Sequence, residues 1–528
     1  MTHEVTNQVP SLDGYDVADD PALLEALRRS DAAWAETELH ELGLKAGSAH
    51  ARLLARQADI HPPVLHTHDR YGHRIDEVEF HPAWHELMAT AVGHGLHAAP
   101  WRDERPGAHV ARAAKFYVWS QAEAGHGCPV SMTYAVVPAL RTSPELARRY
   151  EPLLAAREYD FGTRAPEAKR GLLAGMSMTE KQGGSDVRAN TTSAVPAGDH
   201  HVLTGHKWFT SAPMSDLFLA LAYTQGGLSC FVVPRVLPDG SRNRMFLQRL
   251  KDKLGNRSNA SAELEYDGAV GLLVGEEGRG VRTVIEMVNA TRLDCVLGTA
   301  AGMRSGLVQA THHAVHRKAF GRALVDQPAM RNVLADLAVE SEAATTVALW
   351  LAGTRSRLGL AVTKYWVCKR GPAHAAEALE CLGGNGYVED SGLPRLFRES
   401  PLMSIWEGSG NVAALDALRA MAREPEAVDE FLAEVDAGRG GDRRFDAAAD
   451  AVKVALSDRD DLELRARVLV ERMALLLQGS LLLRYGHPAV ADAFCASRLG
   501  GEGGVAFGTL PRGVDFAAIV ERGCPVLS

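Results

Sequence analysis

The sequence predicts a mainly α-helical protein with a central β-barrel-like insert and an extra helical tail. Ala- and Leu-rich segments with helical spacing fill the first part of the chain and return after Gly280. Between them, near residues 173–275, short β-type runs alternate with Gly, Pro, Asp and Asn. With 528 residues, of which 46% are apolar, the chain can form several hydrophobic cores, so we expect three or four packed units.

The elements follow in order along the chain. A first helical domain is expected over 1–172, where a helix begins at Pro21 after two aspartates and further helical stretches occupy 31–58, 83–97 and 107–124. A β domain is expected over 173–279, with strands at 201–203, 217–221 and 230–233. A helical bundle over 280–425 contains helices near 281–316, 327–352, 361–382 and 411–423, and a helical tail over 426–528 follows.

This order has consequences for any nucleotide site. It lacks the alternating βαβ pattern of doubly wound folds, so a flavin would need a cradle other than a Rossmann sheet. The segment Gly275–Gly280 has the wrong spacing for a dinucleotide loop and carries two acids, so it is interpreted as a turn that caps the next helix.

Charge and cysteine content limit the function classes. Lys and Arg total 57 against 66 Asp and Glu, a net charge of -9, which argues against a nucleic-acid or membrane footprint over the whole protein but leaves a local basic face open. The first residues form no apolar signal segment, and no run approaches a membrane span. Seven cysteines without a CxxC pair favour a reducing, cytoplasmic location.

Two segments of the β insert carry the densest chemical signal. Met176–Asp186 and Gly205–Ala212 combine glycines, hydroxyls and Trp208. Glycines let backbone N–H groups approach a ligand, and the indole offers a flat apolar face. Either segment alone is more simply a hairpin with polar turns and a core Trp; two of them in one insert favour a ligand site.

These segments resemble the flavin signatures of the acyl-CoA dehydrogenase family. Further matches follow in order, namely Arg317-x-x-Phe320-Gly321 with Leu324 and Gln327, Gly383–Tyr387, and Trp406–Asn411. The predicted order of helical, β and helical domains is also that family's architecture. The resemblance implies a FAD cofactor and an acyl-CoA substrate.

A closer similarity is to the AidB-like, alkylation-response branch of that family. It rests on Glu180–Asp186, Lys251–Ser261, Ile405–Asn411, the extension containing Phe80–His85 and the helical tail. This resemblance implies a FAD-binding homotetramer with dehydrogenase machinery and a role in binding DNA under alkylating stress.

The resemblance implies that Glu407 is the catalytic base. Trp406 and the adjacent glycines can desolvate it, and burial should raise the pKa of a carboxylate toward the working range. A solvated loop glutamate is the alternative. Some relatives place the base directly before an arginine that matches Arg292, but that position is Thr291, which cannot serve.

The family's cofactor contacts carry over to positions of this chain. The expected cofactor-binding residues are Met178, Thr179, Gly184, Ser185, Trp208, Thr210, Ser211, Arg317, Phe320, Gln327, Gly384, Ser409 and Asn411. The segment with Arg317 and Phe320 would reach a neighbouring subunit's flavin; a surface Arg and a core Phe on one helix are the alternative. Glu380 replaces the common family glutamine, so the adenosine pocket is expected to differ.

Histidines and tail arginines complete the candidate residues. His81 and His85 have i,i+4 spacing, but the HExxH pattern fails at residue 89, so surface or core histidines are favoured over a metal site. The tail is net acidic. Its basic cluster of Arg439, Arg443 and Arg444 is the candidate for double-stranded DNA binding without sequence preference, and a solvated face is about equally favoured.

The predicted function is α,β-dehydrogenation of acyl-CoA, linked to the response to DNA alkylation. Trp406, where the family commonly has Tyr, suggests a narrowed pocket and short or branched acyl chains. The alternative is a DNA-binding protective flavoprotein with vestigial dehydrogenase activity.

Overall fold

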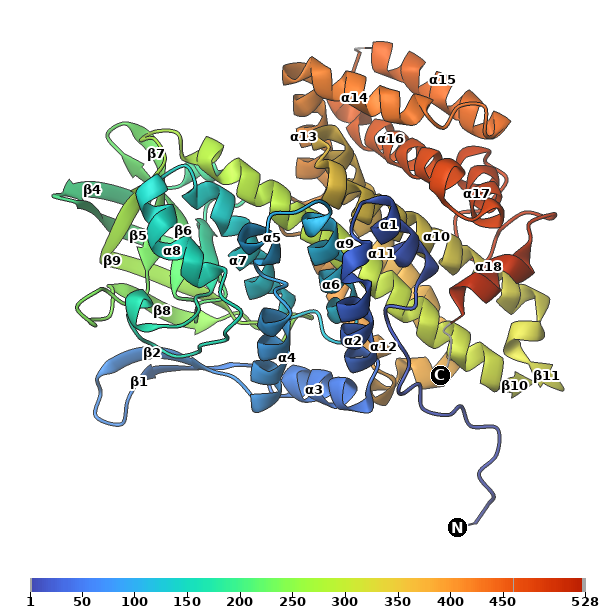
Figure 1. Ribbon diagram of the computed structural model, residues 1–528, viewed down its shortest axis with the longest axis horizontal. Helices are drawn as coiled ribbons and strands as arrows, with labels where there is room; N and C mark the ends of the chain where they lie inside the picture. Colours follow the sequence, from blue (N-terminus) through green and yellow to red (C-terminus); the bar gives the residue numbers. More distant parts are fainter. Residues whose placement is uncertain (1, 459, 525–528) are drawn as a thin grey trace. The chain divides into compact units, whose positions relative to one another are not determined.

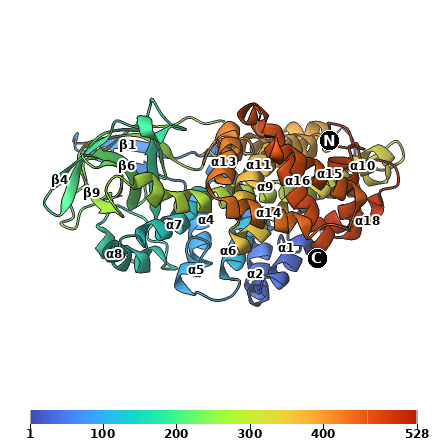
Figure 2. The same cartoon turned by 90° about the horizontal axis from the view of Figure 1, so that it is seen from above.

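The computed structural model describes residues 2–458 and 460–524. The chain divides into two compact units, each assembled from separate segments (Figures 1 and 2). We call the unit made of residues 51–108 and 123–291 the barrel unit, and the unit made of residues 1–50, 109–122 and 292–528 the helical unit. The first 172 residues, predicted as one domain, are thus shared between the two units.

A closed sheet forms the centre of the barrel unit. Its strands are β3 (Ala174–Thr179), β4 (Ser193–Ala197), β5 (His200–Ser211), β6 (Leu217–Thr224), β7 (Gly227–Pro234), β8 (Met245–Leu250) and β9 (Ser261–Val274). The seven strands have the order β3-β5-β4-β6-β7-β9-β8, and extra pairings join β3 to β6 and β5 to β9. Because β3, β5, β9, β7 and β6 pair in a ring, the sheet closes, which confirms the predicted β-barrel-like insert.

Helices cover one side of this sheet and supply its core. The barrel unit contains α3 (Ala49–Ile60), α4 (Pro82–Gly93), α5 (Ala99–Arg102), α7 (Gly127–Leu140) and α8 (Pro144–Leu154). Apolar residues of α7 and α8 pack with the buried runs of β6 and β7 in one hydrophobic cluster. Helix α7 is buried nearly all round, so it lacks the amphipathic pattern that identifies a helix in sequence.

The N-terminal region also contains a hairpin that the sequence reading missed. Strands β1 (Val64–His68) and β2 (Arg74–Glu79) pair antiparallel, joined by a turn in which Gly72 has a φ of 88°. The predicted helical character of the domain 1–172 therefore does not extend to residues 64–79. Both strands carry many polar residues and few apolar ones, so their alternating pattern is weak.

The helical unit is a bundle extended by the tail. Its main helices are α1 (Pro21–Arg29), α2 (Glu36–Ala46), α6 (Ala108–Ser120), α9 (Gly280–His316), α10 (Pro328–Thr354), α11 (Arg357–Glu380), α12 (Leu393–Glu399), α13 (Gly410–Arg423), α14 (Pro425–Asp436), α15 (Arg443–Ser457), α16 (Leu462–Tyr485), α17 (Pro488–Phe494) and α18 (Phe516–Gly523). Helix α9 begins in the barrel unit and continues into this one. A short hairpin follows α9, in which the two-residue strands β10 (Lys318–Ala319) and β11 (Arg322–Ala323) pair antiparallel.

The tail is part of the bundle core rather than a separate arm. Helix α16 packs against α10, α11 and α13, and α14 and α15 pack against α16 (Figure 2). Residues of α9, α10, α16, α17 and α18 share one hydrophobic cluster. Among the described residues, all seven cysteines are free thiols, and no helix is long and apolar enough to cross a bilayer.

Candidate active site

Strand pairing brings the two predicted flavin segments together in the barrel unit. Strand β3 pairs with the end of β5, so Ser177 lies opposite Thr210 and Thr179 lies opposite Phe209. The turn after β3 therefore lies beside the end of β5. Gly205 in β5 has a φ of 152°, and a Cβ there would lie 2.5 Å from Thr192 Oγ1, so this position requires glycine.

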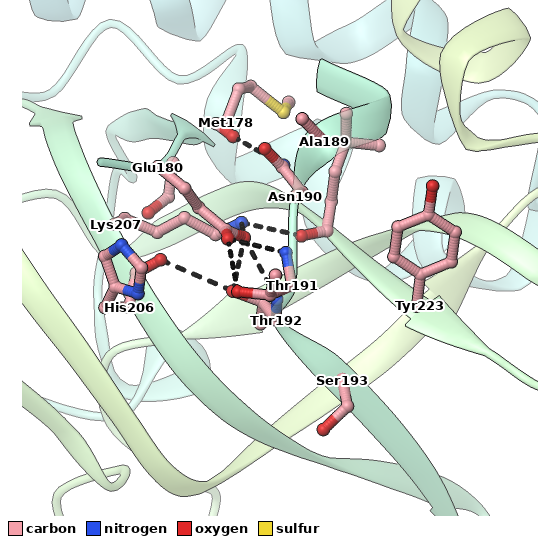
Figure 3. A network of polar contacts seen from close by, with 12 residues as sticks. Met178, Glu180, Ala189, Asn190, Thr191, Thr192, Ser193, His206, Lys207 and Tyr223 are labelled. Carbon is pink, nitrogen blue, oxygen red and sulfur yellow. Dashed lines mark hydrogen bonds and ion pairs between the residues drawn. The ribbon is translucent and has the colours of Figure 1, made fainter. Parts of the chain in front are cut away.

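A buried ion pair connects the two segments (Figure 3). Lys207 Nζ lies 2.8 Å from Glu180 Oε1, and neither side chain is exposed. Glu180 also accepts hydrogen bonds from the backbone N–H groups and hydroxyls of Thr191 and Thr192. Lys207 further donates to the carbonyl of Leu221 at 2.8 Å. Both charges thus have several partners, which a buried pair needs in order to be stable.

The protonation of this pair follows from its surroundings. Burial alone would raise the pKa of Glu180, but hydrogen bonds from Lys207 and Thr192 outweigh it and lower the pKa to about 2. Burial lowers the pKa of Lys207, and Glu180 opposes that change. Glu180 is therefore ionised at neutral pH and serves to hold the two segments in place.

The turn that follows β3 presents the predicted cofactor residues. Gly184 and Ser185 are exposed, whereas Met178 and Thr179 are partly buried. The carbonyl of Met178 accepts a hydrogen bond from Asn190 Nδ2 at 2.9 Å, as Figure 3 shows. The Oδ1 atom of Asn190 is buried and has no hydrogen-bond partner among the described residues. This turn thus offers exposed backbone and a hydroxyl to a ligand.

Trp208 lies among cations. Lys251 Nζ is 3.2 Å from the centroid of one indole ring, and Lys181 and Arg249 lie within 6 Å of it. Lys251 and Arg249 also share the carboxylate of Glu263. The indole is partly buried, so part of it can still face a ligand.

The two hydroxyl residues after Trp208 differ in exposure. Thr210 has no exposed surface, and its hydroxyl lies 2.9 Å from that of Ser177. A ligand contact by Thr210 would have to share that hydrogen bond. Ser211, at the end of β5, is partly buried.

In the helical unit, Glu407 lies in a turn that two cations hold. Glu407 has a φ of 56°, and Gly408 has a φ of 105°. Arg292 Nε donates to the carbonyl of Glu407 at 3.0 Å. The buried ammonium of Lys364 donates to the carbonyls of Trp406, at 2.9 Å, and of Gly408.

The cations themselves are fixed by further contacts. Arg292 forms an ion pair with Asp416 at 2.7 Å, and Arg357 reaches the same carboxylate at 2.9 Å. The hydroxyl of Thr291 is buried and bonds to carbonyls of its own helix, at Met287 and Val288. The hydroxyl of Thr291 is therefore engaged within its own helix.

The residues after the turn lie at the positive end of a helix. Ser409 is the N-cap of α13 but makes no side-chain capping hydrogen bond. Arg467 Nε donates to Asn411 Oδ1 at 2.8 Å. A Cβ on Gly410 would lie 2.9 Å from Lys369 Cε and 3.2 Å from Arg467 Nη2. Two cations thus lie beside Gly410 at the N-terminus of α13, which suits an anionic group.

The other predicted residues lie on exposed loops of the helical unit. Phe320 is 95% exposed at the tip of the β10–β11 hairpin, where it has a φ of 50°. This excludes a core Phe on a helix. Gln327 Nε2 donates to the carbonyl of Ala319 at 2.9 Å and steadies this hairpin, and Arg317 Nη1 donates to the carbonyl of Asn7. Gly384 is exposed, with open space where a Cβ would lie.

The arginines predicted to bind DNA have acidic neighbours. Arg439 pairs with Asp436 at 2.8 Å and with Asp450 at 2.7 Å. Arg444 pairs with Asp442 and Asp492, and Arg443 is exposed. The described residues contain no group of three or more His, Cys, Asp or Glu side chains that could hold a metal ion. His81 caps α4, and His85 Nδ1 lies 2.7 Å from the hydroxyl of Tyr159.

The structure therefore assembles the predicted residues in groups. Met178–Ser185 and Trp208–Ser211 form one group in the barrel unit, and Glu407–Asn411 form another in the helical unit. Sequence reasoning missed the residues that hold these groups, above all Thr191, Thr192 and Lys364. Lys364 lies on a buried helical run without any special pattern, so only its buried charge could have drawn attention.

Family models match three successive parts of the chain. Residues 7–161 match the family described as the adaptive response protein AidB N-terminal domain. Residues 175–269 match the acyl-CoA dehydrogenase middle domain, and residues 278–422 match the acyl-CoA dehydrogenase C-terminal domain.

Relatives cover nearly the whole chain. The Escherichia coli (strain K12) protein AidB, whose name places it among the acyl-CoA dehydrogenases, is 44% identical over 96% of both chains. Acyl-CoA dehydrogenase family member 11 of Caenorhabditis elegans is 31% identical over 85% of this chain and 78% of its own.

Two solved structures are also similar over most of their length. The crystal structure of Caenorhabditis elegans ACDH-11 in complex with C11-CoA has a TM-score of 0.83, 27% identity and 94% coverage of both chains. The apo-form of Bd2924 has a TM-score of 0.82, 29% identity and coverage of 92% of this chain and 100% of its own. The chain therefore belongs to the AidB branch of the acyl-CoA dehydrogenases, a family of FAD-dependent oxidoreductases that act on acyl-CoA.

Proposed function

We propose that this chain removes hydrogen from the Cα–Cβ bond of a short or branched acyl-CoA, with FAD as the oxidant and Glu407 as the base. The observation that carries the proposal is the turn at Trp406–Gly408, whose three carbonyls are held by Arg292 and Lys364. Because the backbone is fixed by cations from two helices, the turn presents one carboxylate in a defined position.

The residues present suit FAD. When bound, FAD supplies an acceptor for the hydride that leaves Cβ. In the barrel unit, Gly184 and Ser185 offer an exposed turn and Trp208 offers an aromatic face. In the helical unit, the N-terminus of α13 with Lys369 and Arg467 suits an anionic group such as a phosphate. The unpartnered Oδ1 of Asn190 is a further acceptor beside the segment with Met178.

Glu407 has the role of taking the Cα proton. A thioester α-proton is weakly acidic, so the base must be held close to it and shielded from water. Trp406 precedes the base, and its indole Nε1 is buried without a hydrogen-bond partner among the described residues. An indole in that state can exclude water from the carboxylate.

The replacement Glu407→Gln tests the base. The amide keeps the shape of the carboxylate but accepts no proton, so flavin reduction by an acyl-CoA should slow by about 10²–10⁴-fold or more while flavin content stays the same. Anaerobic stopped-flow absorbance measures both. Reduction at the parental rate would show that the base is another residue.

The preference for short or branched chains rests on the volume of Trp406. The related ACDH-11 was crystallised with C11-CoA, which makes an intermediate chain a useful third substrate. We expect faster flavin reduction by isovaleryl-CoA than by C11-CoA or palmitoyl-CoA. Faster reduction by palmitoyl-CoA would contradict the narrowed pocket.

We also propose a homotetramer in which the β10–β11 hairpin contacts a neighbouring subunit. Phe320 is 95% exposed and Tyr387 is 82% exposed, and aromatic side chains with such exposure favour an interface. The variant Phe320→Ala should keep its fold but bind FAD less tightly. Light scattering gives the oligomeric state and flavin titration gives the affinity; a monomeric parent would exclude the assembly.

The alternative, a DNA-binding protective flavoprotein, draws support from the matched family's description as an adaptive response protein. Against it stands the net charge of -9, and acidic partners already neutralise Arg439 and Arg444. Any duplex binding should therefore fall steeply with salt and ignore sequence.

A salt titration of duplex binding by the parent and by a variant with Arg439, Arg443 and Arg444 all changed to Ala tests this role. Weaker binding by the variant with unchanged flavin reduction would support it. If the parent binds no DNA at low salt, this role is excluded.

A further inference from the structure

A small cavity in the barrel unit lies outside the candidate active site. Its volume is about 100 Å³, and its lining includes Arg74 and Asp76 of β2 together with Arg235, Arg242 and Arg244, which lie between β7 and β8. Strand β1 of the same hairpin packs against β8, and Figure 1 shows the hairpin passing that strand. None of the residues assigned to FAD or to the base lines this cavity.

Arg235 contributes a charge without a carboxylate partner. Its guanidinium donates to two backbone carbonyls, that of Met214 at 3.2 Å and that of Asp76 at 2.9 Å. Among the described residues, no carboxylate lies within ion-pair distance of it. Burial, together with the charge of Arg242, lowers the pKa of Arg235 to about 10, because the more distant carboxylates of Asp216, Glu77 and Asp76 oppose this change only in part. A guanidinium in such a place normally has an anionic partner.

Asp76 contributes an acceptor without a donor. It is 7% exposed, and its Oδ2 accepts from Arg74 Nε at 2.9 Å. Its Oδ1 is buried and has no hydrogen-bond partner among the described residues. Asp76 also has a φ of 43° within β2, a conformation that non-glycine residues rarely adopt and that is common at functional sites.

The other arginines that line the cavity form ion pairs with carboxylates. Arg242 Nη2 lies 2.7 Å from Glu77 Oε1, and Arg244 Nη2 lies 2.7 Å from Asp267 Oδ2. With Arg74 paired to Asp76, the charge of Arg235 is left in excess. Asn243 fixes the segment between Arg242 and Arg244, because its side chain donates to the carbonyl of Pro234 and accepts from the backbone of Val270.

We propose that this cavity binds a phosphate monoester or inorganic phosphate in its singly protonated form. The phosphoryl oxygens accept hydrogen bonds from Arg235 and Arg242, and the P–OH group donates to Asp76 Oδ1. Inorganic phosphate meets both needs because it is anionic and still carries at least one P–OH donor near neutral pH; a phosphate monoester, whose second pKa is about 6, meets them as its monoanion. Sulfate has the same shape but no proton at that pH, so it leaves Asp76 unpartnered and places two anions together.

Inorganic phosphate titrated calorimetrically into the full-length, FAD-loaded protein tests the proposal, with sulfate as the matched anion. We expect phosphate to bind at least about 10-fold more tightly than sulfate, a difference of about 1.4 kcal/mol. Absence of phosphate binding, or equal affinity for both anions, would overturn the proposal.

Two variants and a control sharpen the test. Asp76→Asn places an amide donor in the cavity, so it should weaken phosphate binding and strengthen sulfate binding. Arg242→Gln, at a partly exposed position that tolerates change, should weaken phosphate binding at least about 5-fold. Arg170→Gln, an exposed arginine of the same unit paired with Glu158, should change neither. An unchanged ratio of phosphate to sulfate affinity in Asp76→Asn would overturn the proposal.

A comparison of CoA with dephospho-CoA distinguishes the two sources of the phosphate. This arm rests on the proposed function, because acyl-CoA would bring a phosphate monoester with it. If CoA binds more tightly and Arg242→Gln removes the difference, the cavity holds the 3′-phosphate of CoA. If the two bind equally while inorganic phosphate binds, free phosphate is the ligand. The phosphate titration remains readable even if no acyl-CoA reduces the flavin.

Discussion

The two groups of candidate active-site residues are held in place by different means. In the barrel unit, Glu180 and Lys207 belong to the two predicted flavin segments themselves, and their ion pair joins these segments directly. In the helical unit, Arg292 and Lys364 come from α9 and α11, and they hold the turn with Glu407 through its backbone carbonyls.

This difference separates two kinds of mutational sensitivity. A buried ion pair depends on both partners, because removal of one leaves an uncompensated charge in the protein interior. A turn held through its carbonyls is anchored at backbone atoms, so its position depends on the cations that hold it and not on the side chains of the turn itself. Substitutions at the ion pair of the barrel unit should therefore mainly lower stability. Substitutions at the cations that hold the Glu407 turn should mainly lower the rate of flavin reduction.

The largest effect is expected for Lys207→Met. This change leaves the buried carboxylate of Glu180 without its ammonium partner and should lower the free energy of unfolding by about 3–5 kcal/mol, with loss of bound FAD. Thermal unfolding and flavin absorbance measure the two effects.

The double variant Glu180→Gln with Lys207→Met is the matched control. It removes both charges and should recover part of the lost stability, since no buried charge remains. If the single variant is as stable as the parent, the ion pair does not hold the segments together.

A smaller effect on stability and a larger effect on rate are expected for Lys364→Met. The carbonyls of Trp406 and Gly408 lose their donor, which should cost about 1–3 kcal/mol of stability. A displaced turn should slow flavin reduction by about 10-fold or more at saturating acyl-CoA and shift its pH profile. Lys453→Met, at a surface ion pair of the same unit, is the control and should change neither quantity measurably. Unaltered kinetics in Lys364→Met would assign Lys364 to stability alone.

The same contrast explains what the sequence could predict. The order of helices and strands follows from local patterns, and Glu180 and Lys207 lie inside the two segments whose glycines, hydroxyls and Trp208 predict a ligand site. Arg292 and Lys364 lie far from Glu407 in sequence, and the structure brings them together by helix packing, which no local pattern encodes. Helix α7 and the β1–β2 hairpin were missed because one is buried all round and the other is mostly polar.

Acid should weaken the barrel unit through Glu180. The pKa of this group is about 2 in the folded protein against an ordinary value of 4.5. A lowered pKa stabilises the fold above the ordinary value, and this contribution is lost as the pH falls from 4.5 toward 2. By pH 4 the loss of stability should be about 1 kcal/mol.

Urea unfolding at pH 7 and pH 4 measures this loss, and in Glu180→Gln this part of the pH dependence should vanish. An unchanged pH dependence in that variant would assign the acid sensitivity to other carboxylates, such as Glu340 in the helical unit, whose pKa is also about 2 because Arg370 and Arg498 outweigh its burial.

The smallest effect on stability is expected for Ser409→Ala. An N-cap serine usually contributes about 1 kcal/mol through its side chain, but Ser409 makes no capping hydrogen bond. The variant should therefore unfold within about 0.5 kcal/mol of the parent. If its hydroxyl instead contacts FAD beside Lys369 and Arg467, the affinity for FAD should fall by about 5-fold, the loss of one hydrogen bond.

Asp442→Ala is the matched control, because Asp442 caps α15 by accepting from the backbone N–H of Arg444 at 2.7 Å. That variant should lose about 1 kcal/mol of stability and keep its FAD affinity. Equal losses of stability in both variants would show that the Ser409 side chain stabilises α13, and a role for this side chain in binding FAD would then lack support.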